Sequence, residues 1–447
     1  MQNQSSSHSK NKKTQWHTFY QQSHSRYISF WLQFLQEHAA EYHIIETDEV
    51  NIRSAWLAAT KQERETDLLL ALEPLYQFYR TKGRLNEGQG VIATTVSFLN
   101  LSKEDISKQP LVRQKLYGRL LARQAWFCWN LARYNLAKSL VERSWTLSQK
   151  NDDKENLAFL YLIRASTIYY QDGNKQQQKN FNESSYELYS EIGDMRGMVR
   201  SLQNLAINYN EAGDYETAKE LLQEAITICQ QQGDGYLDTL VRCLINLGVS
   251  LEGLEQYTEA NTAYEACYEV CEQLQNQLGM SYSLANQSQI ALRLNHFAKA
   301  KASIQKQILI SQKISDHFLF ATGKADLGNA YYMLKEFPLS LESLREGLNV
   351  AIMIGSKPAM IHVISQFSHL LYHLGEDILS LTLWTIIQPY LNPHHHLGNP
   401  ENLHEILVSK LAPKTVMAIQ SEWEGKELDD AVRLIQNYMN NYTLKNE

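Results

Sequence analysis

Apolar and polar residues follow a helical period along most of this chain, and the clearest stretch is residues 195–234. Its apolar residues recur three or four positions apart, as on one face of a helix. The pattern breaks at Ala212, Gly213 and Asp214 and stops at Gly233. Glycine readily takes the left-handed conformation at a helix end, and aspartate caps the helix that follows. The stretch therefore predicts two helices joined by a tight turn.

The same unit recurs about every 40 residues. An aromatic residue follows the turn in five units: Tyr134, Tyr215, Tyr257, Phe297 and Phe337. Three positions later comes a small residue that lets the two helices approach closely: Ala137, Ala218, Ala260, Ala300, Ser340 and Ser380. Polar residues suited to an N-cap mark the junctions between units: Asp153, Asp194, Asp234, Asn276, Asp316 and Ser356. This regularity predicts an all-α solenoid of about seven long helix-turn-helix repeats, beginning near residues 114, 154, 195, 235, 277, 317 and 357.

The unit resembles the tetratricopeptide repeat (TPR). That repeat's pattern of leucine, small residue, tyrosine and two later alanines is met by Leu205, Ala206, Tyr209, Ala218 and Ala225. Its usual period is about 34 residues, so the helices predicted here are longer. The resemblance implies a right-handed TPR superhelix whose first helices line a concave groove, with helical caps covering the apolar faces at its ends.

Two flanking segments resemble those that open and close the helical sensor region of STAND-type signalling ATPases, including LuxR-type and maltose-regulator-like proteins. The opening segment matches at Glu49, Asn51, Ile52, Arg53, Ala55, Trp56, Gly83, Arg84, Leu85, Glu87 and Gly88. The closing segment runs from Ser421 to Val432. We expect Val50, Ile52, Trp56 and Leu57 to face the core, and Trp423 and Val432 to be buried.

The chain departs from that family in lacking a glycine-rich phosphate loop. Gly323 and Lys324 fall inside a repeat helix and lack the preceding glycine. The chain is thus expected to be the sensor part of such a regulator or a free-standing relative of it. The predicted organisation is a disordered segment at 1–14, an N-terminal helical cap at 15–110, the TPR array at 111–385 and a C-terminal helical cap at 386–447.

Composition narrows the function classes. Only 8 prolines and 20 glycines interrupt 447 residues, which favours helix throughout. The net charge of −7 disfavours nucleic-acid binding. The polar N-terminus has no apolar stretch typical of a secretion signal, and no segment has the length and apolarity of a membrane span. Five cysteines at ordinary helical positions fit a reducing compartment. We therefore expect a cytoplasmic location, and the oligomeric state stays open.

Candidate chemistry is sparse. The run His394–His396 lies on a predicted loop, where adjacent side chains diverge and are poor metal ligands together. Cys267 and Cys271 lie one helical turn apart, but Cys267 takes the small-residue packing position of the repeat, so both are expected in the core. No nucleophile or metalloprotease motif is found. We predict no metal, no cofactor and no enzymatic activity.

The concave face of the first helices is the predicted binding surface. Its expected residues mix aromatic, amide and charged groups, as in protein contacts: Trp126, Trp129, Thr167, Tyr170, Arg200, Gln203, Asn210, Arg242, Glu252, Tyr282, Gln289, Asn329, Tyr332 and His369. The predicted ligand is a protein or peptide, with a small-molecule inducer as an open alternative. A constitutive scaffold is the alternative function. A quorum-sensing type of peptide receptor ranks lower, because only Asn210 and Asn329 supply asparagine to the groove.

Overall fold

The computed structural model describes residues 21–39, 41–101, 105–172, 174–390 and 403–446. These described residues form helices and turns without a β-strand. They divide into two compact units, one made of Met1–Asn208 with Gln231–Tyr236, the other of Tyr209–Gln230 with Leu237–Glu447. No described helix is long and apolar enough to cross a lipid bilayer.

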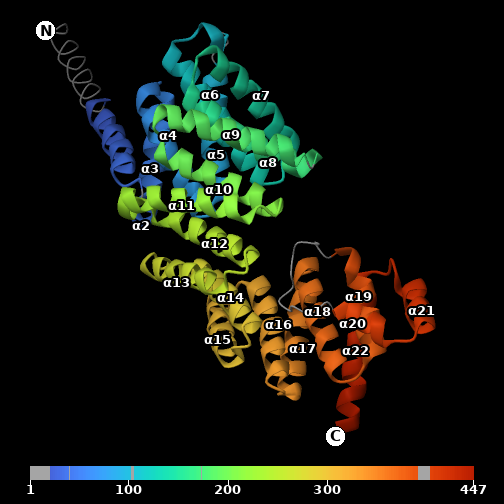
Figure 1. The fold of residues 1–447 in the computed structure, drawn as a ribbon. Coiled ribbons are helices and arrows are strands. Elements are labelled where there is room, and N and C mark those ends of the chain that lie inside the picture. Colours follow the sequence, from blue (N-terminus) through green and yellow to red (C-terminus); the bar gives the residue numbers. More distant parts are fainter. Residues whose placement is uncertain (1–20, 40, 102–104, 173, 391–402, 447) are drawn as a thin grey trace, which may run out of the picture. The chain divides into compact units, whose positions relative to one another are not determined.

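The first unit is a series of helices that pack as successive pairs (Figure 1). After a helix over residues 21–37 come α2 (Tyr42–Thr47), α3 (Glu49–Lys61), α4 (Glu65–Thr81), α5 (Leu85–Leu101), the 3-10 turn Ile106–Lys108, α6 (Leu111–Asn130), α7 (Tyr134–Lys150), α8 (Lys154–Asp172), α9 (Lys175–Ile192) and most of α10 (Met195–Glu211). Within this unit α6 packs on α7 and α8 on α9, and the first helices α6 and α8 also contact each other.

The second unit continues the same plan. It contains most of α11 (Tyr215–Gln232), then α12 (Leu237–Gly253), α13 (Tyr257–Gln273), α14 (Gln277–Arg293), α15 (Phe297–Lys313), α16 (His317–Met333), α17 (Phe337–Met353), α18 (Lys357–His373), α19 (Asp377–Ile387), α20 (Leu403–Lys410), α21 (Pro413–Trp423) and α22 (Leu428–Asn446). Helices α20 to α22 pack on α19, and α22 also packs on α18. The second helix of the last pair, α19, is shorter than its predecessors.

The sequence features of the repeat act as predicted. The five turn aromatics are the first residues of α7, α11, α13, α15 and α17. All six small residues after the turns are fully buried. Four of the six junction residues cap the next helix: the side chains of Asp194, Asn276, Asp316 and Ser356 accept a backbone N–H three residues on, at 3.0, 3.0, 2.9 and 3.4 Å. The seven pairs begin within three residues of the predicted starts.

The described tight turns of the repeat array each place one residue in the left-handed region. Glycine fills it at Gly213 and Gly355, but Lys335 fills it with φ 61°. The turn at Lys335 closes with N–H donation from Glu336 to the Tyr331 carbonyl at 2.8 Å, which satisfies a carbonyl at the end of α16. The conformation therefore belongs to the repeat geometry and does not depend on glycine.

Helices α4 and α5 form a further pair that the seven predicted repeats did not include. They pack on each other and both contact α6, as a repeat unit contacts its successor. Leu85 stands at the aromatic position of the turn and Gly88 at the small position. A Cβ on Gly88 would come within 2.5 Å of the Phe127 ring, so the helices approach too closely for a side chain.

The expected burial of four apolar residues on α3 is only partly correct. Ile52 and Trp56 are buried as predicted, but Val50 is 63% exposed. Ile52 and Trp56 lie four residues apart on one face, and Val50, two residues before Ile52, points away from it. Leu57 is half-buried against the core. In the C-terminal helices Val432 is buried, whereas Trp423 is only half-buried.

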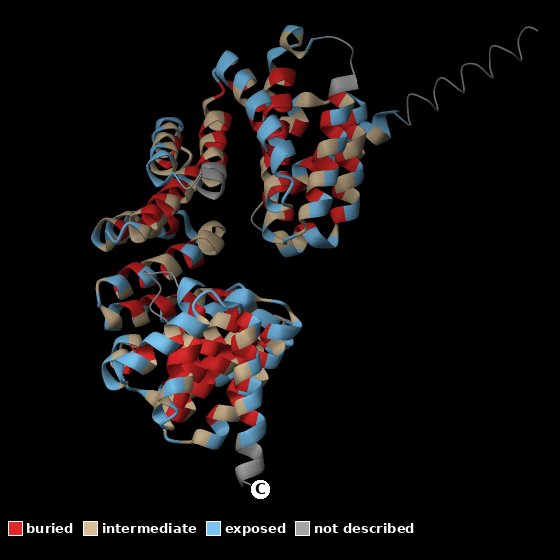
Figure 2. Ribbon diagram, turned by 90° about the vertical axis from the view of Figure 1, so that its right-hand side faces the viewer, coloured by how far each residue is buried: buried red, intermediate tan, exposed pale blue. Residues whose placement is uncertain are grey.

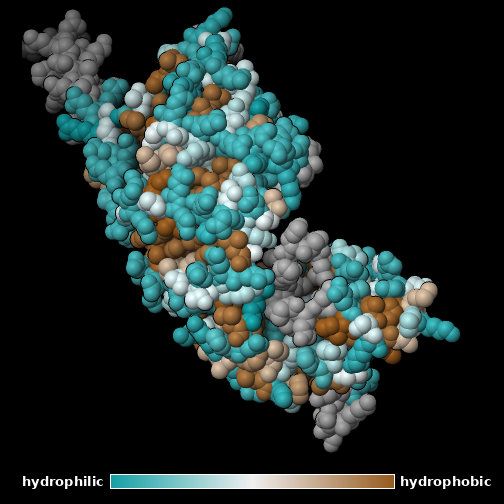
Figure 3. All heavy atoms as spheres, in the orientation of Figure 1, coloured by the Kyte–Doolittle hydropathy of each residue, from teal (hydrophilic) through white to brown (hydrophobic). Residues whose placement is uncertain are grey.

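The buried residues line the surfaces where paired helices meet (Figure 2). In the first unit one apolar cluster runs from Ile28 to Ile163, and in the second the largest runs from Ala321 to Met439. The face seen in Figure 3 is largely hydrophilic, with apolar side chains showing between the helices. Burial between helices stabilises repeats that cannot cover their own apolar faces.

Candidate binding surface

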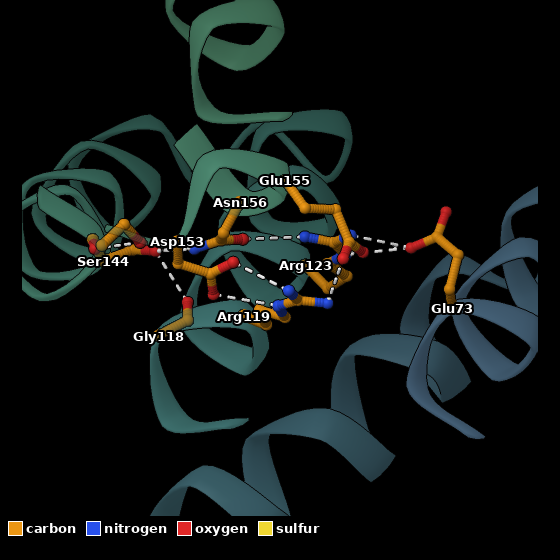
Figure 4. Close-up of polar contacts among 9 residues, drawn as sticks. Glu73, Gly118, Arg119, Arg123, Ser144, Asp153, Glu155 and Asn156 are labelled. Atoms are coloured by element: carbon orange, nitrogen blue, oxygen red, sulfur yellow. Dashed lines mark hydrogen bonds and ion pairs between the residues drawn. The ribbon is translucent and has the colours of Figure 1, made fainter. Parts of the chain in front are cut away.

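A polar network joins the first helices of three successive pairs in the first unit (Figure 4). Arg123 of α6 donates to Glu73 of α4 from Nε at 3.2 Å and from Nη2 at 2.8 Å. Its Nη1 donates to the Asn156 side-chain oxygen on α8 at 2.9 Å. The guanidinium also lies 3.9 Å from the centroid of the Phe159 ring. Arg123 of α6 is therefore held by side chains of two other helices, α4 and α8.

Asn156 is fixed in turn by α7. Its amide donates to the hydroxyls of Ser144 at 3.0 Å and Ser148 at 2.8 Å. Ser144 donates to the Gly118 carbonyl on α6 at 2.6 Å. A buried network of this kind is stable only when its members are paired. These contacts hold the Arg123 side chain in one orientation.

The carboxylate of Glu73 is strongly acidic. Burial among protein atoms opposes its ionisation, but the charges of Arg123 and Arg200 and hydrogen bonds from Arg123 and Gln77 outweigh this, lowering its pKa to about 2. Its side chain is nevertheless 39% exposed. Glu73 is thus an ionised group that solvent, and a ligand, can reach.

A second arginine of α6 anchors the start of α8. Arg119 donates to both carboxylate oxygens of Asp153 at 2.9 and 2.7 Å and pairs with Glu155 at 2.6 Å. The ion pair fixes one repeat against the next. A shallow depression of about 480 Å³ borders it, lined by residues of both charges: Lys115, Arg119, Asp152, Asp153, Lys154, Glu155, Ile192 and Asp194.

The predicted surface residues of the first unit lie at different depths. Trp126 is half-buried, with Arg80 5.6 Å above its ring and Tyr76 edge-on at 5.4 Å. Trp129 is half-buried against Tyr134. Arg200 is half-buried, and Gln203 is buried. The side chains of Thr167 and Tyr170 lie outside the described residues.

In the second unit five predicted residues are accessible to different degrees. Arg242 and Tyr282 are exposed, and Asn210, Glu252 and Gln289 are half-buried. Asn210 accepts a hydrogen bond from the Ser250 hydroxyl at 3.0 Å. Glu252 accepts one from the Tyr264 hydroxyl at 2.7 Å. Burial raises the pKa of Glu252, although that hydrogen bond and Arg293 act against it.

Three predicted residues of the second unit are buried: Asn329, Tyr332 and His369. The Tyr332 ring stacks obliquely on His373 at 5.0 Å, and His369 meets Trp384 edge-on at 5.9 Å. Burial, with a smaller effect of His373, lowers the pKa of His369 to about 4. These side chains are covered by their neighbours, so their assignment as ligand contacts stays a prediction.

Sequence reasoning missed several charged groups. Glu73 and Arg80 were overlooked because α4 was not assigned to a repeat, and Arg123 because it faces inward, three residues before Trp126. Asp326 of α16 was overlooked too. Its Oδ1 lies 2.8 Å from Nε2 of His362 on α18, the first helix of the next pair. The leucine–glycine spacing of Leu85 and Gly88, aligned on the other turns, was the signal available for α4 and α5.

In the described part of the chain, no group of three or more His, Cys, Asp or Glu residues is arranged to hold a metal ion. His394–His396 lie outside the described residues. Cys267 and Cys271 are fully buried on α13, as expected for packing residues.

Comparison with known proteins identifies the repeat. Residues 197–273 match the family model of the tetratricopeptide repeat. No curated protein matches the chain significantly. Among solved structures, the ligand-free form of RapI is 12% identical to this chain, with a TM-score of 0.56. The match covers 78% of this chain and 96% of the RapI chain. The ligand-free quorum sensor NprR from B. thuringiensis is 15% identical with a TM-score of 0.52, covering 82% and 98%.

A third similar structure is a STAND protein with a tetratricopeptide repeat sensor from Pyrococcus horikoshii. It is 15% identical with a TM-score of 0.51, and the match covers 75% of this chain but 54% of that protein. At these identities the likeness is one of fold. The chain has an all-helical, repeat-built TPR fold.

Proposed function

We propose that this chain is a non-catalytic TPR module that binds a segment of a protein or peptide partner against its first helices and acts as a sensor in the cytoplasm. The observation that carries the proposal is the accessible charged and aromatic surface on α4, α6 and α10, formed by Glu73, Trp126 and Arg200. Aromatic and arginine side chains are the groups that dominate protein interfaces.

The comparisons support a sensing role. RapI and the quorum sensor NprR share the fold, and the STAND protein uses its repeats as a sensor. Repeat solenoids supply extended surfaces to which a partner segment can bind. A sensor also needs a ligand that prefers one conformation over another.

The proposal is tested by selecting peptides from a randomised display library on the full chain and measuring their affinity by fluorescence anisotropy. Trp126→Ala should weaken the selected peptides about tenfold or more, since a buried aromatic anchor contributes ~2 kcal/mol or more. Trp145→Ala is the matched control, because Trp145 is also half-buried beneath an arginine but lies on the second helix α7. Equal losses in both variants, or no selectable peptide, would count against the proposal.

A constitutive scaffold is the second candidate, favoured by the fixed network around Arg123 and Asn156, which needs no ligand to form. Hydrogen exchange of the full chain with and without the selected peptide separates the two. A sensor should show altered exchange in helices remote from the peptide, whereas a scaffold should change only where the peptide lies.

A further inference from the structure

Arg200 on α10 is a half-buried arginine that makes no hydrogen bond or ion pair with another described residue. It lies within electrostatic reach of Glu73, Tyr76 and Tyr189 in the first unit. A guanidinium carries five N–H donors, and donors removed from water without a partner are costly. The side chain is therefore suited to an acceptor supplied from outside the chain.

Glu73 does not fill that role. One of its oxygens already accepts both hydrogen bonds from Arg123. The other accepts from the Gln77 amide at 2.5 Å. Both oxygens of this carboxylate are thus engaged by other side chains. Glu73 acts on Arg200 through its charge, but it makes its hydrogen bonds with Arg123 and Gln77.

Tyr76 lies near these charged side chains. Its hydroxyl is fully buried and has no hydrogen-bond partner among the described residues. The charged groups that act on it most strongly are Arg80, Arg123, Arg200 and Glu73. Three of these four groups are positive and one is negative.

Aromatic surface adjoins these charges. Arg80 lies over the Trp126 ring, and that ring meets Tyr76 edge-on. Arg80 is tied to α4 by donation to the Gln77 side chain at 3.0 Å. The positive groups are thus bordered on one side by a half-buried indole that can pack against an apolar side chain.

We propose that Arg200, together with Arg80 and Trp126 of the same unit, forms a subsite for an acidic side chain of the bound peptide, next to an apolar residue. The planar guanidinium matches a carboxylate with two parallel hydrogen bonds, a geometry that lysine cannot supply. This inference rests on the proposed function and names the chemistry of the partner: a peptide segment that carries aspartate or glutamate.

The test uses the display-selected peptides and the full chain. Each selected peptide is compared by fluorescence anisotropy with a version in which Asp and Glu are replaced by Asn and Gln. The protein variants are Arg200→Gln and Arg200→Lys. Arg345→Gln is the matched control, since Arg345 is exposed on the second helix α17 and its loss changes the net charge equally. Thermal melts of all variants check that each is folded.

We expect selected peptides to be rich in acidic residues, and their amide versions to bind about tenfold more weakly or worse. Arg200→Gln should reduce the affinity for the acidic peptide by a similar factor and leave the amide version nearly unchanged. Arg200→Lys should fall between, and Arg345→Gln should have little effect. The wild-type preference should also weaken at higher salt.

Two results would overturn the subsite while leaving the proposed function intact. One is selection of peptides without acidic residues or with equal affinity for their amide versions. The other is an equal loss for acidic and amide peptides in Arg200→Gln. A chain that binds no peptide at all would overturn the subsite and the proposed function together.

Discussion

The ion pair between Glu73 and Arg123 offers the most direct test of the polar network. Glu73→Gln removes the charge of Glu73 and little else. The variant keeps the length of the side chain and one hydrogen-bond acceptor. It leaves the Arg123 guanidinium, whose side chain is 4% exposed, without a carboxylate partner. An unpaired buried charge is destabilising.

The size of the effect follows from the pKa of Glu73. Lowering that pKa from 4.5 to about 2 in the folded chain corresponds to ~3 kcal/mol at 1.36 kcal/mol per pKa unit. The Glu73 side chain is 39% exposed, so solvent screens part of this interaction, and we expect about 1–2 kcal/mol. The loss should be local, because repeats contact chiefly their neighbours.

Hydrogen exchange measured by mass spectrometry reads out local stability. At neutral pH, amides of α4, α6 and α8 should exchange about 5–30 times faster in Glu73→Gln than in the wild type. Because the folded pKa lies below the unfolded value, the stabilisation is fully present above about pH 4.5 and is lost as the pH falls toward 2. The difference between the proteins should shrink over that range.

Glu142→Gln is the matched control. Glu142 pairs with Arg164 at 2.9 Å between neighbouring helices, but its side chain is 60% exposed. Such a pair contributes at most about 1 kcal/mol. Equal exchange rates in Glu73→Gln and the wild type, or equal effects of the two substitutions, would refute our reading of the Glu73 pair.

Three further predictions concern the repeat itself. Gly248→Ala should lower the thermal melting temperature, since a Cβ there would lie 2.3 Å from the Tyr264 ring, and overpacking costs about 1–3 kcal/mol. Lys335→Gly should raise the stability of its turn by a few tenths of a kcal/mol up to about 1, because φ is 61° and glycine adopts that region freely; chemical unfolding measures it. Burial opposes protonation of His362, but Asp326 outweighs this effect and raises the His362 pKa. Asp326→Asn should therefore lower the His362 pKa in an NMR titration. The variant should also lose the stability that the pair contributes below about pH 6.5, which the wild type loses as the pH rises through the folded pKa of His362.

Each of these has a control in the chain. Gly90→Ala meets no atom within 4 Å and should be neutral or stabilising, so a similar loss at both glycines would contradict the packing argument. Gly355→Ala, at φ 62°, should destabilise its turn where Lys335→Gly stabilises. An unchanged His362 titration in Asp326→Asn would show that the carboxylate does not govern it.

Local signals explain what the sequence predicted well. Turn aromatics such as Tyr257, small residues such as Ala260 and caps such as Asn276 act within one helix pair, so their spacing alone locates the helices. The pair α4–α5 was missed because its turn carries Leu85 where five other turns carry an aromatic residue. The burial of Val50 was predicted wrongly because an apolar side chain was assumed to be buried. Its position around the helix, away from the face that carries Ile52 and Trp56, was not considered.

Which of the predicted surface residues are accessible depends on how neighbouring helices pack. The position of a residue within the repeat does not determine that packing. A register assigns Trp126 and Tyr332 to the same face of their helices, but Tyr332 is covered by His373 while Trp126 remains half-buried. The pairing of Glu73 with Arg123 joins residues 50 positions apart. Such contacts arise when whole helices dock, and no local pattern marks them in advance.

The central claim is that a partner binds the first helices of the repeats, and hydrogen exchange of the chain saturated with a display-selected peptide tests it most directly. We predict slower exchange in α4, α6 and α10, where Glu73, Trp126 and Arg200 lie, with α5 and α7 unchanged. Protection confined to the second helices α5, α7 and α9, or the same exchange with and without peptide, would contradict the claim.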